Sequence, residues 1–562
     1  MLNRSPNPIM EPNKRAKLVI GMDFGTTFSG IAWALEGLET QPTVIQEWPG
    51  KGNSTSQKTP TVISYQDGEV RWGYQVNEYK PAVRGVKLLL DKGRQMTTYG
   101  PALESEVIIQ DLKKEPVDIA GDYMMMMVSH VKRVLDRRGI GSLMNTLNVK
   151  YVLTIPGVCS DKAKDLTMQA ACLAGIPQSD LSLLSEPEAA AVYAIKTIQP
   201  NAMAKDDCFI VCDAGGGTVD LITYKITQMN PLRMEEVVEG TGEICGSVML
   251  DELFEQYVKR TIGETEYNGL NESSKRIAMQ KWQNDIKPLY SGPVDDDGFT
   301  YTGDAIPIPG IKDGILHMES EDVQKIFDPV VAKIEALIRA QNVSVQNAGL
   351  SAKAIVLVGG LGASAYLYNR LKSYFKEMEI MQPLNAWSAV VRGAVYRGIQ
   401  GNQVENRKAR SHYGIEISAI FDPTKHRRED RYWCDFYEKW LARYQMQWYI
   451  HKGDAISEDR PITFPFWRRV PTNSSLTFQD DLKFCLIQDA PPIVTSDVAV
   501  LCTLTSDLSR IPKELFEKLT NSRGVEYYVI KFELVLTPFS ASMLFELQFN
   551  GERYGSVQAE YV

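Results

Sequence analysis

The fold of this chain is decided by the stretch Cys208-Phe209-Ile210-Val211-Cys212-Asp213-Ala214-Gly215-Gly216-Gly217-Thr218-Val219-Asp220. Its first half is apolar and rich in β-branched residues, which is typical of a buried strand. Three glycines after the strand allow a tight turn whose N–H groups can bind a phosphate. Because Asp213 and Asp220 would repel that phosphate, they indicate a cation beside it, and Mg²⁺ suits their oxygen atoms. For this stretch by itself, a plain glycine turn is the alternative.

A second copy of the same design lies near the N-terminus, at Leu18-Val19-Ile20-Gly21-Met22-Asp23-Phe24-Gly25-Thr26-Thr27-Phe28-Ser29-Gly30. Again a strand-like run leads into an acid, a glycine turn and paired threonines, and residues 31–34 are typical of a returning strand. Two acid-led phosphate hairpins in separate halves of a chain predict a nucleotide held between two lobes. They match neither a Walker loop, because Gly-x-x-x-x-Gly-Lys-Ser/Thr is absent, nor a Rossmann glycine motif.

Two charged side chains outside the hairpins are candidates for the same site. Glu186 follows a strand-like run at 181–184 and precedes a proline, so its carboxylate can face a cleft. Glu188 fits the positive N-terminal end of the following helix instead. Lys87 lies in Val86-Lys87-Leu88-Leu89-Leu90, where a lysine on the solvated side of a helix is an equally good interpretation.

A third glycine loop follows the apolar run at 354–358. Gly359 and Gly360 end that run, and a helix is predicted at 365–375, so this loop could hold the nucleoside end of a ligand. Gly246 and Ser247 precede a further predicted helix at about 249–262.

Length and composition limit the possible classes of protein. A chain of 562 residues is too long for one core and should hold about three or four domains. Its net charge of −9 gives no reason to expect nucleic acid as a partner. No apolar run approaches the roughly 18 residues of a membrane span. The basic group Arg407-Lys408-Ala409-Arg410 is expected to be a solvated linker.

The N-terminal residues and the cysteines indicate the compartment. Residues 1–16 are polar and lack a signal-peptide core, so they are expected to form a disordered tail. The eight cysteines are scattered, and buried thiols in a reducing compartment fit them better than disulfides. We therefore expect a cytoplasmic or nuclear protein that is not secreted.

Four motifs occur in a fixed order: Asp-Phe-Gly-Thr-Thr at 23–27, the span from Thr154-Ile155-Pro156 to Ser185-Glu186-Pro187, Asp-Ala-Gly-Gly-Gly-Thr-Val-Asp at 213–220, and Val-Leu-Val-Gly-Gly at 356–360. Together they resemble the nucleotide-binding domain of the seventy-kilodalton heat-shock chaperones, within the actin-like ATPase superfamily. The resemblance covers about residues 17–400. The whole chain is most similar to the divergent heat-shock protein 12A/12B-like branch, which is abundant in fungi.

The resemblance implies an α/β fold of two actin-like lobes, each built like ribonuclease H, followed by a β-rich C-terminal domain. Lobe I is expected at 17–206, with an insert at about 41–115. Lobe II is expected at 207–400, with an insert at about 240–310 and a last helix that could return to lobe I. The β-rich domain is expected at 411–562, where strand-like runs include 413–417, 446–450, 527–536 and 544–549. Asn550-Gly551 is typical of a hairpin turn that joins the last run to 553–561.

The family also implies roles for single residues. ATP or ADP would bind with Mg²⁺, which Asp23 and Asp213 would hold. Lys87, Glu186 and Asp213 would be the catalytic side chains. Asp23 would also contact the nucleotide, and the other nucleotide contacts would be Gly25, Thr26, Thr27, Gly215, Gly216, Gly217, Thr218, Gly246, Ser247, Lys287, Gly359 and Gly360.

The chain departs from the family pattern at three places near the base and the phosphates. Leu361-Gly362-Ala363 stands where the family has an arginine that stacks on adenine. Trp387 stands in place of an acid, and Phe28 in place of a tyrosine. These departures bear on base selectivity and turnover.

The function expected from these features is that of an ATP-binding, Mg-dependent and weakly ATP-hydrolysing protein resembling a chaperone. Its nucleotide state would control a C-terminal domain that binds an unidentified protein client. One alternative is a nucleotide-gated scaffold with little or no hydrolysis. A metabolite kinase of the same superfamily is the other, and it is disfavoured because no separate acceptor-binding group of residues is found.

Overall fold

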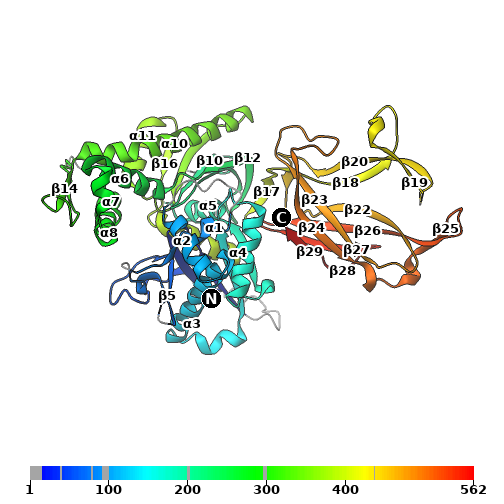
Figure 1. The fold of residues 1–562 in the computed structure, drawn as a ribbon, viewed down its shortest axis with the longest axis horizontal. Coiled ribbons are helices and arrows are strands. Elements are labelled where there is room, and N and C mark those ends of the chain that lie inside the picture. The colour runs from blue at the N-terminus through cyan, green and yellow to red at the C-terminus, as the bar shows by residue number, and fades with distance from the viewer. Residues whose placement is uncertain are drawn as a thin grey trace, which may run out of the picture.

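The computed structural model describes residues 16–37, 41–66, 68–77, 80–91, 100–198, 203–294, 300–435 and 437–562. An α/β part precedes a β-rich C-terminal part, which lies to one side of it and is drawn from yellow to red in Figure 1. The expected α/β class with a β-rich C-terminal domain is confirmed. The disordered tail expected at 1–16 lies outside the described residues, apart from Ala16.

The central sheet of lobe I places the first hairpin at its middle. β1 (Lys17–Asp23) pairs antiparallel with β2 (Phe28–Leu35) and parallel with β8 (Asn148–Ile155), which pairs with β9 (Leu181–Ser185). Because β1 is apolar almost throughout, it is buried on both faces, as a central strand should be. Asp23 and Ser185 are the last residues of their strands, so they lie toward the same edge of the sheet.

Smaller elements surround this sheet. Short strands β3 (Thr43–Val44) and β4 (Thr59–Pro60) pair with β2. A three-stranded sheet contains β5 (Val62–Gln66), β6 (Glu69–Trp72) and β7 (Val83–Arg84). The helices of lobe I are α1 (Val86–Leu89), α2 (Gly100–Asp111), α3 (Pro116–Arg137), α4 (Asp161–Leu173) and α5 (Glu186–Thr197).

Lobe II repeats the arrangement around the second hairpin. Its seven-stranded sheet has the order β16 (Glu379–Met381), β15 (Ala352–Val358), β10 (Cys208–Ala214), β11 (Val219–Gln228), β12 (Arg233–Glu243), β17 (Val404–Lys408) and β21 (Ala455–Ile456). The remaining elements of lobe II are helices α6 (Ser247–Ile262), α7 (Glu264–Gly269), α8 (Glu272–Lys281), α9 (Lys287–Leu289), α10 (Ser320–Asn347), α11 (Ala365–Tyr374) and α12 (Ala389–Gln400), and the hairpin β13 (Asp304–Pro307) with β14 (Ile315–Met318). β17 carries the chain out of lobe II toward the C-terminal domain.

Helices α5 and α12 pack against each other between the two sheets. One buried cluster contains residues of both helices together with Val19 of β1 and Phe209 of β10. A side chain on Gly393 of α12 would lie 1.7 Å from the carbonyl oxygen of Ala189 in α5, so only glycine allows this approach. Although α12 follows lobe II in the sequence, it packs against β1 and β8 of lobe I.

The C-terminal domain consists of two antiparallel sheets around one apolar core. The first has the order β19 (Arg431–Cys434), β20 (Lys439–Ile450), β18 (His412–Ile420), β23 (Thr477–Cys485), β24 (Val498–Asp507) and β29 (Gln558–Tyr561). The second contains β22 (Ile462–Pro471), β25 (Glu517–Thr520), β26 (Glu526–Pro538), β27 (Met543–Phe549) and β28 (Glu552–Ser556). Asn550 and Gly551 both have positive φ, as the predicted two-residue turn requires.

Three expectations about the chain need correction. Residues 553–561 form two strands in different sheets, because β28 stays with β27 whereas β29 pairs with β24. Arg407 is not part of a solvated linker but is buried in β17. All eight cysteines are unpaired, and Cys172 is exposed rather than buried.

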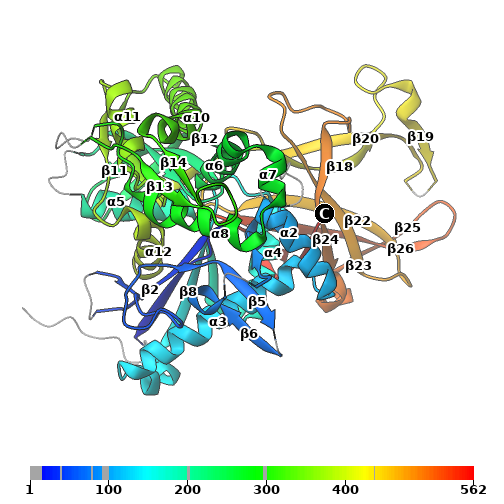
Figure 2. The ribbon, with the colours of Figure 1, turned by 60° about the vertical axis from the view of Figure 1, so that its left-hand side comes forward.

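Within the described ranges, no helix has the length and apolar character needed to cross a membrane. The C-terminal domain, which lies beside the α/β part in Figure 2, meets the lobes through β17 and the turn between β26 and β27. Ala541, in that turn, packs into the apolar core of lobe I. The two domains are therefore joined by packed side chains as well as by the chain itself.

Candidate nucleotide-binding site

The two glycine hairpins face each other across the lobes. A side chain on Gly216 would place its Cβ 2.3 Å from Oγ1 of Thr27, and one on Gly217 would lie 2.7 Å from Oγ1 of Thr26. Such distances are shorter than any real contact, so these positions require glycine. The structure thus brings together the phosphate-binding residues that the sequence predicts in separate halves of the chain.

The second hairpin is fixed from behind by the start of α6. The N–H groups of Gly246, Ser247 and Val248 donate to the carbonyl oxygens of Gly217, Gly215 and Gly216, at 3.1, 3.1 and 2.9 Å. These bonds use the carbonyl side of the turn, whereas a phosphate is bound by N–H groups. Gly246 and Ser247 therefore support the phosphate hairpin in this structure.

The third glycine loop packs against the end of β10. Gly359 has a φ of 92°, and a Cβ on it would lie 2.5 Å from Oδ1 of Asp213. The N–H groups of Leu361 and Gly362 both donate to the carbonyl oxygen of Ala214. All three glycine loops consequently meet around Asp213.

Phe28 and Trp387, two of the residues that depart from the family pattern, lie side by side near Gly360. The rings of Phe28 and Trp387 are 5.6 Å apart at an angle of 75°. A Cβ on Gly360 would lie 3.7 Å from the same indole ring. Phe28 belongs to lobe I and Trp387 precedes α12, so this edge-to-face pair connects elements far apart in the sequence.

Two lysines form ion pairs with acids of the candidate site, one at the first hairpin and one at the start of α5. Lys87 of α1 donates to Oε1 of Glu186 at 2.5 Å, and Lys58 donates to Oδ2 of Asp23 at 2.6 Å. The pair of Lys58 with Asp23 is buried, and the pair of Lys87 with Glu186 is largely buried. Sequence reasoning missed Lys58, because it lies in no motif. Only the pairing of β4 with β2 brings it to the first hairpin.

The charges of this cluster are not balanced. Asp23, Asp213 and Asp220 are buried and Glu186 is largely buried, and the three cations that act on these four acids are Lys58, Lys87 and Arg410. Burial raises the pKa of Glu186 to about 7 even though Lys87 opposes the shift. Burial together with the charges of Glu186, Asp220 and Asp23 holds the pKa of Asp213 well above its usual range.

The pKa of Lys87 is raised by the same acids. Burial alone would lower its pKa, but Glu186 and Asp23 outweigh that effect and the pKa is raised. The lysine therefore stays positively charged at neutral pH. A cluster with more acids than lysines favours the uptake of a further cation or a proton.

The acids present suit a magnesium ion that arrives with a nucleotide. Within the described residues, the carboxylate of Asp213 has neither a hydrogen bond nor an ion pair, although it is buried. No three His, Cys, Asp or Glu side chains in those ranges converge on a ready-made metal site. Mg²⁺ commonly uses one or two carboxylates together with phosphate oxygens and water, which fits this arrangement.

The sequence predicted Asp220 beside a cation, but in the structure its carboxylate accepts a hydrogen bond from the backbone. Its Oδ1 accepts a hydrogen bond from the N–H of Val158 at 2.9 Å. Asp220 therefore ties the second hairpin to the loop after β8.

Lys287 donates to Oδ1 of Asp251 at 2.7 Å, one helical turn beyond Ser247. Its predicted contact with a nucleoside stays a prediction.

Glu188 lies in the first turn of α5, as expected, and its side chain has further partners at the domain junction. Its side chain is 2% exposed and accepts two hydrogen bonds from Arg407 of β17, at 2.8 and 3.1 Å. Ser540 of the C-terminal domain donates to it at 2.6 Å. Burial is the largest single influence on the pKa of Glu188 and raises it, but Arg407, Arg397 and Ser540 together outweigh burial, so the net pKa is lowered. Tertiary contacts have made this acid part of the domain junction.

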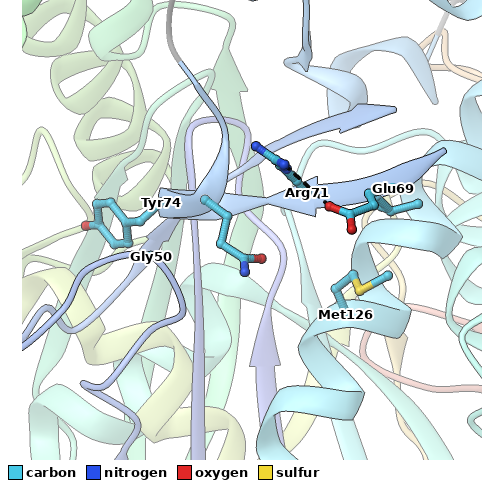
Figure 3. A pocket seen from close by; sticks show the side chains of 7 residues that line it. Gly50, Glu69, Arg71, Tyr74 and Met126 are labelled. Atoms are coloured by element: carbon cyan, nitrogen blue, oxygen red, sulfur yellow. Dashed lines mark hydrogen bonds and ion pairs between the residues drawn. The ribbon is translucent and has the colours of Figure 1, made fainter. Parts of the chain in front are cut away.

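The structure has an open surface hollow of about 780 Å³ that is separate from these residues (Figure 3). Glu69 and Arg71 of β6 line it and form an exposed ion pair at 3.4 Å, with Tyr74 and Met126 nearby. None of the predicted site residues borders it. A smaller cavity of about 100 Å³ lies at the domain junction, next to Glu188, Arg407 and Ser540.

Comparisons with known proteins agree with the resemblance seen in the sequence. Residues 19–406 match the model of the family described as Hsp70 protein, and residues 407–562 match a domain of unknown function. Human heat shock 70 kDa protein 12B is 23% identical over 86% of this chain and 84% of its own length. Human heat shock 70 kDa protein 12A is 22% identical, over 76% and 77%. A chaperone protein HscA homolog from Acinetobacter baumannii is 26% identical over 44% of this chain and 38% of its own length.

Proposed function

Because the chain belongs to the Hsp70 family, we propose that it binds ATP between its lobes, hydrolyses it slowly with Mg²⁺, and thereby controls its C-terminal domain. That domain would bind a protein client in a manner resembling a chaperone. The net charge of −9 gives no support to a nucleic-acid partner. The same proposal places the protein in the cytoplasm or nucleus, as its eight unpaired cysteines suggest.

The observation that carries this proposal is the position of the segment 185–188. Glu186 of this segment pairs with Lys87 beside the hairpins. The flanking residues point the other way, because the N–H of Ser185 donates to Oγ of Ser540 at 3.1 Å and Glu188 binds Arg407. A shift of Glu186 upon nucleotide binding would therefore move contacts of the C-terminal domain only one or two residues away. Such a segment supplies a physical link between the two sites.

Hydrolysis would depend on positioning and on charge. Transfer of a γ-phosphoryl group to water requires in-line geometry and neutralisation of charge on the phosphate oxygens. Lys87 would stabilise that charge, and Glu186 would orient the attacking water. Asp23 and Asp213 would hold Mg²⁺, which when bound neutralises part of the charge on the phosphates.

The test of catalysis is single-turnover hydrolysis of ATP with Mg²⁺. Wild type should convert bound ATP to ADP, whereas Asp213→Asn and Lys87→Ala should bind ATP and lose most of the hydrolysis. Lys325→Met changes an exposed lysine of α10 and serves as the control. Equal rates in wild type and both site variants would contradict the assigned roles.

Whether the nucleotide state affects the C-terminal domain is tested by hydrogen exchange at the turn between β26 and β27. Exchange of peptides covering 536–545 should differ between the ATP and ADP states in wild type. The difference should shrink in Ser540→Ala, which removes the contact with Ser185 and Glu188. Identical exchange in both nucleotide states would show that the domains are not coupled.

A nucleotide-gated scaffold with little hydrolysis is the second candidate. It is favoured by Asp23, because this predicted metal ligand is already paired with Lys58. It is also favoured by Trp387, which replaces an acid of the family pattern. Tight binding of ATP that remains intact through the single-turnover experiment would select this candidate.

A further inference from the structure

Lys58 is a buried lysine at a position where the predicted site needs positive charge. Its Nζ lies 2.6 Å from Oδ2 of Asp23, and the two side chains are 9% and 4% exposed. The backbone of Lys58 is held on both sides. Its carbonyl accepts a hydrogen bond from Tyr74, and the adjacent Thr59 pairs with Ser29 in β2.

The packing around Lys58 directs its stem along the first hairpin. A Cβ on Gly30 would lie 3.3 Å from Cγ and 3.8 Å from Cδ of Lys58. The absence of a side chain at Gly30 therefore makes room for the lysine. Asp23 directly precedes the turn that contains Thr26 and Thr27. The ammonium group of Lys58 therefore lies beside the acid that begins the predicted phosphate-binding turn.

The ion pair with Lys58 competes with the predicted role of Asp23 as a ligand of Mg²⁺. Contact between Asp23 and a divalent ion would require separation of a buried ion pair, which leaves an ammonium group without its partner. Phosphate oxygens of a nucleotide are the acceptors that could then receive it. With either partner, the positive charge of Lys58 remains beside the phosphates.

We propose that Lys58 is a built-in cation of the phosphate site, which allows this protein to bind a nucleoside di- or triphosphate with little dependence on a divalent metal. The inference rests on the proposed nucleotide site and concerns its metal requirement. In a site without Lys58, binding the phosphates would add negative charge to four acids, so a divalent ion would be needed for affinity. Lys58 supplies one positive charge permanently, and it occupies one of the two predicted metal ligands.

The test is the affinity for ADP and ATP, measured by calorimetry with Mg²⁺ and again with EDTA. For wild type we expect a loss of less than about threefold when the metal is removed. Lys58→Met should lose more than about tenfold in affinity when Mg²⁺ is replaced by EDTA. Lys58→Arg keeps the charge and should behave like wild type. Lys325→Met, which removes an exposed charge on α10, should also behave like wild type.

Binding of Mn²⁺ to the ADP complex, followed by electron paramagnetic resonance, gives an independent measure. Lys58→Met releases Asp23 as a ligand, so it should bind Mn²⁺ more tightly than wild type does. If Lys58→Met fails to fold, the wild-type affinities and Lys58→Arg still decide the matter. A wild type that loses more than about tenfold in EDTA would overturn the inference while leaving the nucleotide function intact. A wild type that binds no nucleotide under either condition would overturn the proposed function and the inference with it.

Discussion

Replacement of Arg407 by methionine tests whether the domain junction depends on a buried ion pair. Arg407 and Glu188 have side chains that are 9% and 2% exposed, and two hydrogen bonds join them. Arg407 also contacts Glu458 at 3.1 Å. Methionine fills a similar volume but leaves Glu188 with the neutral donor Ser540 and, as its remaining cation, the more distant Arg397 at 3.9 Å. Removal of one partner from a buried pair costs about 3 to 5 kcal/mol.

Hydrogen exchange is the suitable assay, because a chain of several domains does not unfold in one step. A cost of about 3 kcal/mol corresponds to a roughly hundredfold faster opening of the peptides that cover 536–545 and 404–408. Peptides from β13 and β14, which lie at the opposite end of the molecule in Figure 1, should not change. The control is Arg427→Met, since Arg427 is half exposed and its pairs should contribute no more than about 1 kcal/mol. If Arg407→Met changed exchange as little as Arg427→Met does, the junction would not rest on this pair.

Three further outcomes follow from the geometry. Gly216→Ala should reduce nucleotide affinity by about tenfold or more because its methyl group would collide with the facing threonine, whereas Gly269→Ala, which has open space around it, should have no effect in the same titration. Trp387→Ala removes the ring contact with Phe28, worth about 0.5 to 1.5 kcal/mol, so a labelled nucleotide should dissociate up to roughly tenfold faster in stopped-flow measurements. Burial lowers the pKa of His130, so the folded state binds a proton less readily than the unfolded state does. The unfolding temperature should therefore fall as the pH drops below about 6.5, and the fall should be smaller in His130→Gln.

Much of the candidate site could be predicted because its chemistry is local. An apolar run followed by an acid and glycines specifies a strand and a tight turn within about a dozen residues. Both hairpins and the third loop formed where these patterns occur, around Asp213, Thr27 and Gly359. The turn at Asn550 and Gly551 was predictable for the same reason, since both residues tolerate positive φ.

Other functional residues carried no local signal. Lys58 is an ordinary lysine in sequence, and its role depends on the pairing of β4 with β2. Arg407 resembled a solvated linker, because its buried partner Glu188 is more than two hundred residues away. Glu188 satisfies a simple rule for helix ends, since it lies in the first turn of α5, but that rule gave no sign of its contact with the C-terminal domain.

The sequence by itself determined the strands, the glycine turns and the kinds of side chain available to a phosphate, because backbone freedom and apolar periodicity act over short distances. Only the tertiary structure decided which charges became partners. The energy of a buried charge depends on what lies within a few ångströms of it, and that is set by which strands and domains pack together. The pairs Lys58 with Asp23 and Arg407 with Glu188 exist for this reason, and they connect the phosphate hairpins and the C-terminal domain to the rest of the molecule.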